Sequence, residues 1–269
     1  MGKTIDITFF WLSFWSYLVS FFLFTFYGAL KRKAVGKAAA LFFSVAFVML
    51  TGGIVARTVI STHPPLATMY EYALVMSWVA SIAFVVFFLK THNLYYGVIV
   101  SPMVVVVLVM ASLLPKEISK QLMPALKSCW FYIHVTLAAF SEGAFAVATG
   151  AAIVYLLKFR GVTGDQLPAD EPLEEFISRS IRIAYPLFTI GAMFAGAMWA
   201  RNAWGSFWSW DPKETGSLVV WLYYTLLIHQ ELRGKWRKRR LAVMTIVGFI
   251  VIVLSFFGNL FLGGLHAYT

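Results

Sequence analysis

The chain has 269 residues, of which 60% are hydrophobic and only 13% are charged, and its mean hydropathy is +0.77. A soluble domain needs a far more charged surface, so this composition excludes an ordinary soluble protein and predicts a chain embedded in a lipid bilayer. The formal net charge is +10, but the basic residues lie between apolar segments, as topology signals do, and we expect no nucleic-acid binding. A single cysteine, Cys129, excludes an internal disulfide and a multi-cysteine metal site.

Eight apolar segments follow one another along the chain, each long enough to cross a bilayer as a helix. They cover residues 5–30, 38–60, 72–90, 95–114, 129–157, 183–200, 215–232 and 241–262. The first is too long and too aromatic for a cleaved signal peptide and has no small-residue cleavage pattern, so we expect it to be retained. The sequence therefore predicts an all-α polytopic integral membrane protein with about eight transmembrane helices.

Lysine and arginine are distributed unevenly between alternate connectors. One set of connectors holds 15 of the 22 basic residues, namely Lys31, Arg32, Lys33, Lys37, Lys90, Lys158, Arg160, Arg179, Arg182, Arg233, Lys235, Arg237, Lys238, Arg239 and Arg240. The opposite side holds Lys3, Arg57, Lys116, Lys120, Lys127, Arg201 and Lys213. Because basic connectors remain in the cytoplasm, we expect both termini on the outer, periplasmic side.

Two longer connectors carry patterns of their own. In the outer connector 115–127, Ile118, Leu122 and Leu126 recur at helical spacing and indicate a surface helix. The cytoplasmic connector 158–182 mixes acidic and basic residues, which is typical of a short, solvated amphipathic segment. No internal repeat is evident, so a transporter built from duplicated halves gains no support.

The five histidines differ in their expected depth. His134 lies just inside the outer end of the fifth apolar segment, and His266 lies just beyond the outer end of the eighth. Two outer histidines at similar depth could supply both axial ligands to a haem iron at the membrane surface, because imidazole is a common haem ligand. The alternative is that both are interfacial residues with no ligand role.

Two ionisable residues are expected within the bilayer, where they are costly and therefore indicate function. His229 lies in the inner half of the seventh segment, and Glu142 lies about 12 Å deeper than His134 along the fifth. Glu142 could orient a histidine, carry protons or bond a neighbouring helix, and the sequence does not choose among these roles. It also assigns no role to His63 or to the first helix.

The outer connector 199–215 is rich in tryptophan. Four of the ten tryptophans fall within twelve residues, namely Trp199, Trp204, Trp208 and Trp210. Interfacial belts place only one or two aromatic residues at each helix end, and an anchoring loop is the alternative interpretation. A cluster separated by glycine and serine indicates instead a flat apolar surface for a large planar ligand.

The polar residues of this connector have a structural interpretation. Asp211, followed by Pro212 and Glu214, fits a helix N-cap, a proline in the first turn and the acidic residue of a capping box. We therefore interpret Asp211 as the start of the seventh helix rather than as a catalytic acid. Arg57 and Arg201 lie at outer helix ends and could pair with haem propionates, with interfacial snorkelling as the alternative.

The stretch from Trp204 to Asp211 resembles the WWD signature of haem-handling membrane proteins, the CcsA/ResC and CcmC/CcmF families. Three histidines match the family order, namely His134 before the signature, His229 after the next helix and His266 after the last. The segment 65–78 resembles CcsA-type members, whereas CcmC is typically shorter, with six spans. The resemblance separates two N-terminal helices, 1–60, from a WWD-family haem-handling domain, 61–269.

The resemblance implies that haem b is transported as a ligand and substrate to the outer face. There His134 and His266 would be the axial ligands of its iron, beside the tryptophan loop and Asp211, and His229 would mark an earlier intramembrane position. The family reaction is covalent attachment of haem to the Cys-x-x-Cys-His motif of an apocytochrome c, performed together with a CcsB/ResB-type membrane partner. The expected location is the bacterial cytoplasmic membrane, with the thylakoid membrane as the alternative.

Three other functional classes fit parts of this pattern. A CcmC-like haem exporter or chaperone without synthase activity would share the residues discussed above. A quinone-reactive or proton-conducting subunit would need facing histidine pairs at two depths, whereas only His134 and His229 lie within the predicted spans. A purely structural scaffold would leave the tryptophan cluster without an explanation.

Overall fold

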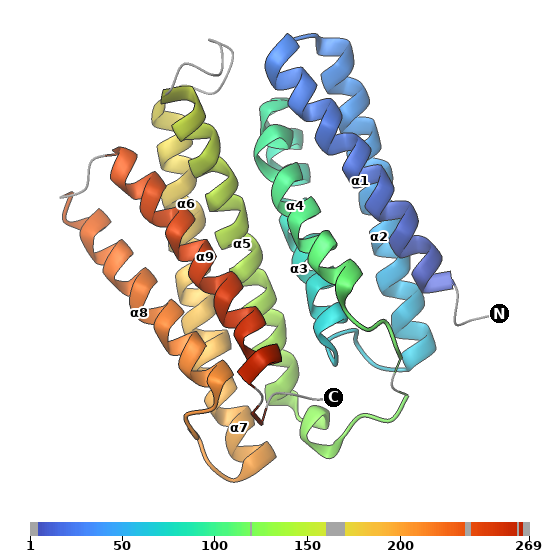
Figure 1. Cartoon of the computed structure of the whole chain (residues 1–269), viewed down its shortest axis with the longest axis vertical. Helices are drawn as coiled ribbons and strands as arrows, with labels where there is room; N and C mark the ends of the chain where they lie inside the picture. Colours follow the sequence, from blue (N-terminus) through green and yellow to red (C-terminus); the bar gives the residue numbers. More distant parts are fainter. Residues whose placement is uncertain (1–4, 119, 160–169, 235–237, 263, 266–269) are drawn as a thin grey trace. The chain divides into compact units, whose positions relative to one another are not determined.

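The computed structural model describes residues 5–118, 120–159, 170–234, 238–262 and 264–265, and helices joined by short connectors make up these residues (Figure 1). The longer helices are α1 (Ile5–Leu30), α2 (Lys33–Ser61), α3 (Met69–Thr91), α4 (Tyr95–Leu113), α5 (Cys129–Phe159), α6 (Asp170–Phe188), α8 (Pro212–Leu232) and α9 (Lys238–Leu262). A π-helical segment, η3 (Thr189–Ala195), continues α6 directly into α7 (Gly196–Trp204). The eight predicted apolar segments are therefore all helical.

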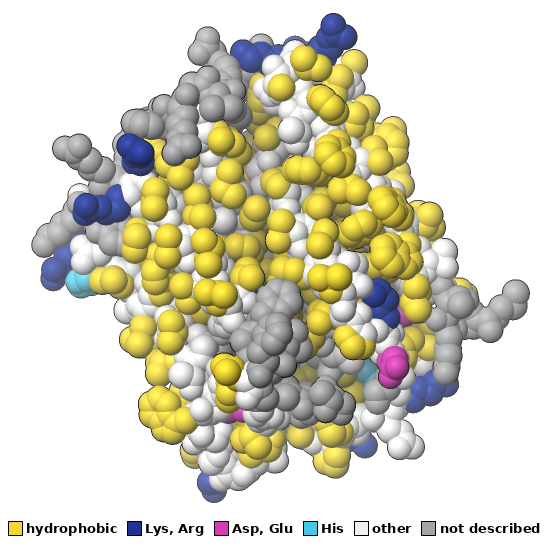
Figure 2. All heavy atoms as spheres, viewed as in Figure 1, with side chains coloured by type: hydrophobic (Ala, Val, Ile, Leu, Met, Phe, Trp, Pro, Cys, Tyr) yellow, Lys and Arg dark blue, Asp and Glu magenta, His cyan; other side chains and the backbone are white. Residues whose placement is uncertain are grey.

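Within the described part of the chain, seven helices are long and apolar enough to cross a membrane: Ile5–Leu30, Lys33–Ser61, Met69–Leu89, Tyr95–Leu113, Cys129–Lys158, Leu173–Trp204 and Arg239–Phe256. Helix α8 has 21 residues, enough for a span, but polar residues near both of its ends reduce its hydropathy. Figure 2 shows hydrophobic side chains over the middle of the helices, and most lysine and arginine side chains toward their ends. The polytopic membrane fold is confirmed, whereas the outer location of both termini stays a prediction.

The chain divides into two compact units. The first contains Met1–Gln121 with Leu157–Pro172, and in it α1 packs against α2 and α4, while α3 packs against α4 and α2. The second contains Leu122–Leu156 with Leu173–Thr269, and in it α8 packs against α9 and η3. Each unit therefore has a helical core of its own.

The sixth span begins earlier than the sequence pattern predicts. Its helix already includes Leu173, so the apolar pattern 183–200 marks only the later part of this helix. The amphipathic character predicted for 173–182 agrees with its alternation of buried and exposed residues, and its solvation stays a prediction. Two ion pairs stabilise these first turns, namely Glu175–Arg179 within the helix and Arg182 with Glu231 of α8. Such pairs make a charged segment helical without making it apolar, which is why hydropathy alone misses it.

The surface helix predicted for 115–127 was wrong, because the described residues of this segment contain only one short 3₁₀ turn, η2 (Pro124–Lys127). Leu114 ends α4 in an extended conformation, as expected for a residue before a proline. The backbone carbonyls of Lys116 and Glu117 accept hydrogen bonds from Arg57 at 3.0 and 2.6 Å. These carbonyls have a tertiary partner in place of the helical N–H groups that the predicted helix would have supplied.

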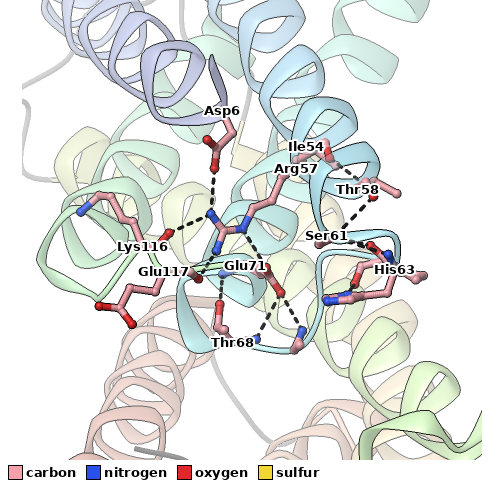
Figure 3. A network of polar contacts seen from close by, with 12 residues as sticks. Asp6, Ile54, Arg57, Thr58, Ser61, His63, Thr68, Glu71, Lys116 and Glu117 are labelled. Atoms are coloured by element: carbon pink, nitrogen blue, oxygen red, sulfur yellow. Dashed lines mark hydrogen bonds and ion pairs between the residues drawn. The ribbon is translucent and has the colours of Figure 1, made fainter. Parts of the chain in front are cut away.

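Arg57 is the centre of a buried ion cluster in the first unit (Figure 3). Its guanidinium has 0% of its surface exposed and donates to Glu71 at 2.7 Å and to Asp6 at 2.8 Å. Glu71 also belongs to a capping box with Thr68 at the start of α3. The cluster therefore joins the start of α1, the last turns of α2, the start of α3 and the connector after α4.

Lys116 lies against the same cluster. Its ammonium group is 5.5 Å from the ring centroid of Phe10, 5.8 Å from that of Trp11 and 5.6 Å from that of Tyr70. It also donates to the backbone carbonyl of Ser112 at 2.7 Å. Partial burial lowers the pKa of Lys116 below its usual value, and the surrounding rings and carbonyl favour the charged form.

We expect Arg57→Met to destabilise the first unit by about 3–5 kcal/mol, because the substitution leaves two buried carboxylates without their cation. Equilibrium unfolding in mixed micelles measures this loss. The control is Arg179→Met, since the Arg179–Glu175 pair is 73% and 51% exposed and a surface ion pair contributes little to stability. Equal losses in the two variants would contradict a structural role for the buried cluster.

Candidate functional site

His134 is held by the backbone of the π-helical segment. Its Nδ1 lies 2.9 Å from the carbonyl oxygen of Gly191, in the middle of η3. A carbonyl can only accept, so Nδ1 carries a proton, and in the neutral imidazole the lone pair is then on Nε2. Metal-ligating histidines commonly have this arrangement, in which a second hydrogen bond fixes the tautomer and the orientation of the ring.

Two glycines allow this close packing of α5 against η3 and α7. A Cβ atom on Gly196 would lie 3.0 Å from His134 Nδ1, and one on Gly191 would collide with Leu137. The π-helical turn occurs where these glycines lie, and single π-turns often mark functional sites. The position of the imidazole therefore depends on backbone geometry as well as on side chains.

The indole ring of Trp199 covers one face of His134. The two rings are nearly parallel, with an interplanar angle of 10° and centroids 5.8 Å apart. Trp199 is only 1% exposed, its Nε1 donates to the carbonyl of Ala125 at 2.7 Å, and Trp204 packs on it edge-on at 4.8 Å. Trp199 is thus a core residue that supports His134, and it is not part of the exposed aromatic surface.

The tryptophan loop begins where α7 ends. Gly205 follows the helix with φ of 82°, a left-handed conformation that glycine adopts without strain. Arg201 donates to the Gly205 carbonyl at 2.8 Å and lies over the ring of Phe207, which is 52% exposed. Arg201 is therefore at the surface beside the loop, where an anionic ligand could reach it.

Trp208 and Trp210 form the outer part of the loop. Their rings are perpendicular, with centroids 5.8 Å apart, and Trp210 is 70% exposed. Trp210 also has φ of 60°, a conformation that costs a bulky residue about 1–3 kcal/mol. Strained backbone conformations cluster at functional sites, which makes Trp210 a candidate binding residue.

The start of α8 confirms the prediction for Asp211. Its Oδ2 accepts from the backbone N–H of Lys213 at 3.0 Å, and Glu214 completes the capping box by accepting from Asp211 N at 3.3 Å. Glu214 also accepts from the backbone N–H and the hydroxyl group of Ser209. These bonds fix the end of the tryptophan loop to the first turn of α8.

The C-terminal segment contacts Asp211 at the start of α8. The second carboxylate oxygen of Asp211, Oδ1, accepts from the backbone N–H of Leu265 at 2.6 Å. His266, the second predicted axial ligand, lies outside the described residues. The tryptophan loop, the start of α8 and the residue before His266 are thus brought together at one end of the second unit.

Three other predicted site residues lie elsewhere. His229 is in the last turn of α8 with an exposed side chain, and Glu142 is buried in α5. Arg57 belongs to the first unit, where its guanidinium is fully buried and bonded. A propionate would need an accessible guanidinium, and this favours the structural role for Arg57 over the predicted ligand contact.

Three glycines that shape the site, Gly191, Gly196 and Gly264, have no local sequence signal, because a glycine in an apolar helix or near a chain end does not reveal which atom approaches it. In the first unit, Glu71 does have a signal, the Thr-x-x-Glu capping box at 68–71. Its pairing with Arg57 depends on tertiary structure.

The fold and the site together define a class, the polytopic helical membrane proteins with an exposed tryptophan loop beside a helix-bound histidine. The chain belongs to the cytochrome c assembly protein family, whose profile matches residues 66–266. It is therefore a protein of cytochrome c biogenesis.

Individual relatives agree with this assignment. The chain is 32% identical over 238 residues to a cytochrome c biogenesis protein CcsA from Guillardia theta, a match that covers 79% of each protein. It is 33% identical over 218 residues to the CcsA of Chlamydomonas reinhardtii, over 77% of this chain and 62% of that protein. It is 29% identical over 250 residues to the CcsA of Prochlorococcus marinus, over 82% and 81%.

A solved structure, the cytochrome c haem lyase CcmF, matches with a TM-score of 0.73. The match covers 98% of this chain at 17% identity, and it shows a shared fold. The chain spans about half the length of that lyase, since the match covers 49% of it.

We expect Glu214→Ala to loosen the tryptophan loop. The substitution removes the acceptor of the Ser209 and Asp211 N–H groups and half of a capping box, a loss of about 1 kcal/mol. Hydrogen–deuterium exchange of peptides covering 205–212 should become faster. Lys213→Ala is the control, because this neighbouring side chain is outside the capping box, and unchanged exchange in Glu214→Ala would contradict the assignment.

Proposed function

We propose that the chain presents haem b at the outer face of the membrane, with His134 and His266 as axial ligands and the tryptophan loop against the porphyrin. The observation that carries the proposal is the bond from His134 Nδ1 to the Gly191 carbonyl. It directs the lone pair to Nε2, the atom that an axial ligand needs. The exposed rings of Phe207 and Trp210 supply apolar surface for a planar ligand.

Other parts of the proposal follow from the family. Arg201 would pair with a propionate by a charge-assisted hydrogen bond. His229, exposed on α8, would mark an earlier haem position within the bilayer. The expected location is the bacterial cytoplasmic membrane, with the thylakoid membrane as the equivalent.

The chemical step would be covalent attachment of haem to an apocytochrome c, together with a CcsB/ResB-type partner. Each thiol of the Cys-x-x-Cys-His motif adds across one vinyl group, so that the sulfur bonds to one vinyl carbon and the thiol hydrogen moves to the other. No atom is released and no nucleophile from this chain is needed. The role of this chain is to orient the haem and exclude water while the substrate thiols react.

The axial-ligand assignment predicts that His134→Gly and His266→Gly each lose the haem absorption bands of the detergent-purified protein. Added imidazole should restore the bands, because it can enter the space left by the missing side chain. The control is His92→Gly, since His92 has φ of 52° at the end of α3 and glycine fits that conformation. Full haem retention in both site variants would exclude these two ligands.

The tryptophan loop predicts a fluorescence change. Haem quenches nearby indoles, so the fraction of emission lost on adding haem should fall in Trp210→Phe. Trp15→Phe is the matched control, because Trp15 is similarly exposed, at 58%, but lies in the first unit. If the two variants change the quenched fraction equally, Trp210 is not beside the haem.

A haem exporter or chaperone of the CcmC type is the second candidate, since it would use the same binding residues. Co-expression with the partner and an apocytochrome c separates the two functions. Covalently attached haem that depends on His134 and His266 supports the synthase. Haem binding without attachment, in the presence of the partner, supports the exporter.

A further inference from the structure

The carboxylate of Asp211 makes contacts of two kinds, which serve different purposes. Its Oδ2 caps α8 through the N–H of Lys213, and its Oδ1 accepts from the N–H of Leu265, 54 residues later in the chain. Asp211 is only 5% exposed, so both bonds form away from bulk water, where a charged acceptor is strong. A helix cap needs only the first contact, so the second requires another explanation.

Gly264 is shaped to allow the second contact. Its φ of 122° is in a region that residues with side chains rarely adopt, and a Cβ atom there would collide with Asp211 Oδ1 and lie 2.9 Å from Pro212 Cδ. Glycine is therefore required for two independent reasons. Leu265 follows with its side chain 44% exposed, so its backbone N–H, and not its side chain, holds this segment to Asp211.

We propose that Asp211 is a positioning residue that anchors the C-terminal segment, through Leu265, to the start of α8 and the end of the tryptophan loop. The inference rests on the proposed haem site, because His266, the next residue after Leu265, is one of its axial ligands. The aspartate of the WWD signature then needs no contact with haem. Its role is to bind the loop and the ligand segment to one helix end.

The substitution Asp211→Asn distinguishes the helix cap from the contact with Leu265. Asparagine caps helices about as well as aspartate, but it offers one oxygen and one NH₂ group where the carboxylate offers two oxygens. In either orientation of the amide, one of the two backbone N–H groups faces a donor. Gly264→Ala disrupts the contact from the other side and leaves the cap chemistry unchanged.

The anchoring can be measured without haem. A nitroxide spin label is attached after Leu265→Cys in a Cys129→Ser background, which removes the single native thiol. Electron paramagnetic resonance should show a more mobile label in Asp211→Asn and in Gly264→Ala. The control is Gly234→Ala, also a glycine with positive φ, 62°, but with open space around the added Cβ. A label equally immobile in Asp211→Asn and in the parent would overturn the anchoring.

The effect of Asp211 on haem binding is tested by a separate measurement. Haem binding should weaken by about 10–100-fold in Asp211→Asn, as is usual when the support of a metal ligand is removed, and imidazole should restore it as in His266→Gly. In a His266→Gly background whose haem binding is restored by imidazole, the same substitution should cause less than about a twofold further loss, because the group it positions is absent. Haem affinity equal to that of the parent, or fully additive losses, would overturn the positioning role. If His134→Gly and His266→Gly themselves retain haem, the proposed function fails, and the spin-label result still decides whether Asp211 anchors the segment.

Discussion

In a bilayer, every backbone N–H and C=O group must find its partner within the protein, because the hydrocarbon offers none. Regular α-helices meet this requirement, and departures from the α-helix need local compensation. The segment Thr189–Ala195 departs by one π-helical stretch, and there the Gly191 carbonyl accepts both from Gly196 N and from His134. The irregular turn within a span thus both satisfies its own backbone and fixes the tautomer of the histidine beside it.

Both units use the same chemical device at the start of a helix. Glu71 completes a capping box with Thr68, and it also pairs with Arg57. Asp211 forms a capping box with Glu214, and it also binds Leu265 N. A carboxylate has two oxygens, so one can satisfy the helix end while the other holds a distant segment. Buried acidic residues are costly in a membrane protein. Because each of these carboxylates makes both a helix cap and a tertiary bond, few acidic residues are needed to hold several segments together.

The sequence predicts much of the fold because hydropathy reports the spans directly. All eight apolar segments are helical, and the Asp211 cap follows from residue types at fixed spacing. The wrong prediction, the surface helix at 115–127, involves backbone groups whose partner is distant in sequence. Arg57 satisfies the carbonyls of Lys116 and Glu117 in place of a helix. Trp199 could not be distinguished from the exposed tryptophans, since burial depends on tertiary packing.

The two predicted iron ligands are supported in different ways, and this has a chemical consequence. His134 lies within a span, stacked on Trp199 and bonded to the Gly191 carbonyl, so moving it would disturb three helical segments. The segment before His266 follows the end of α9 and is bound to Asp211 through one backbone hydrogen bond. If an apocytochrome histidine replaced His134 in the proposed haem site, both the stacking on Trp199 and the hydrogen bond to Gly191 would have to be broken. Among the described residues, these contacts are what would hold His134 in place during attachment.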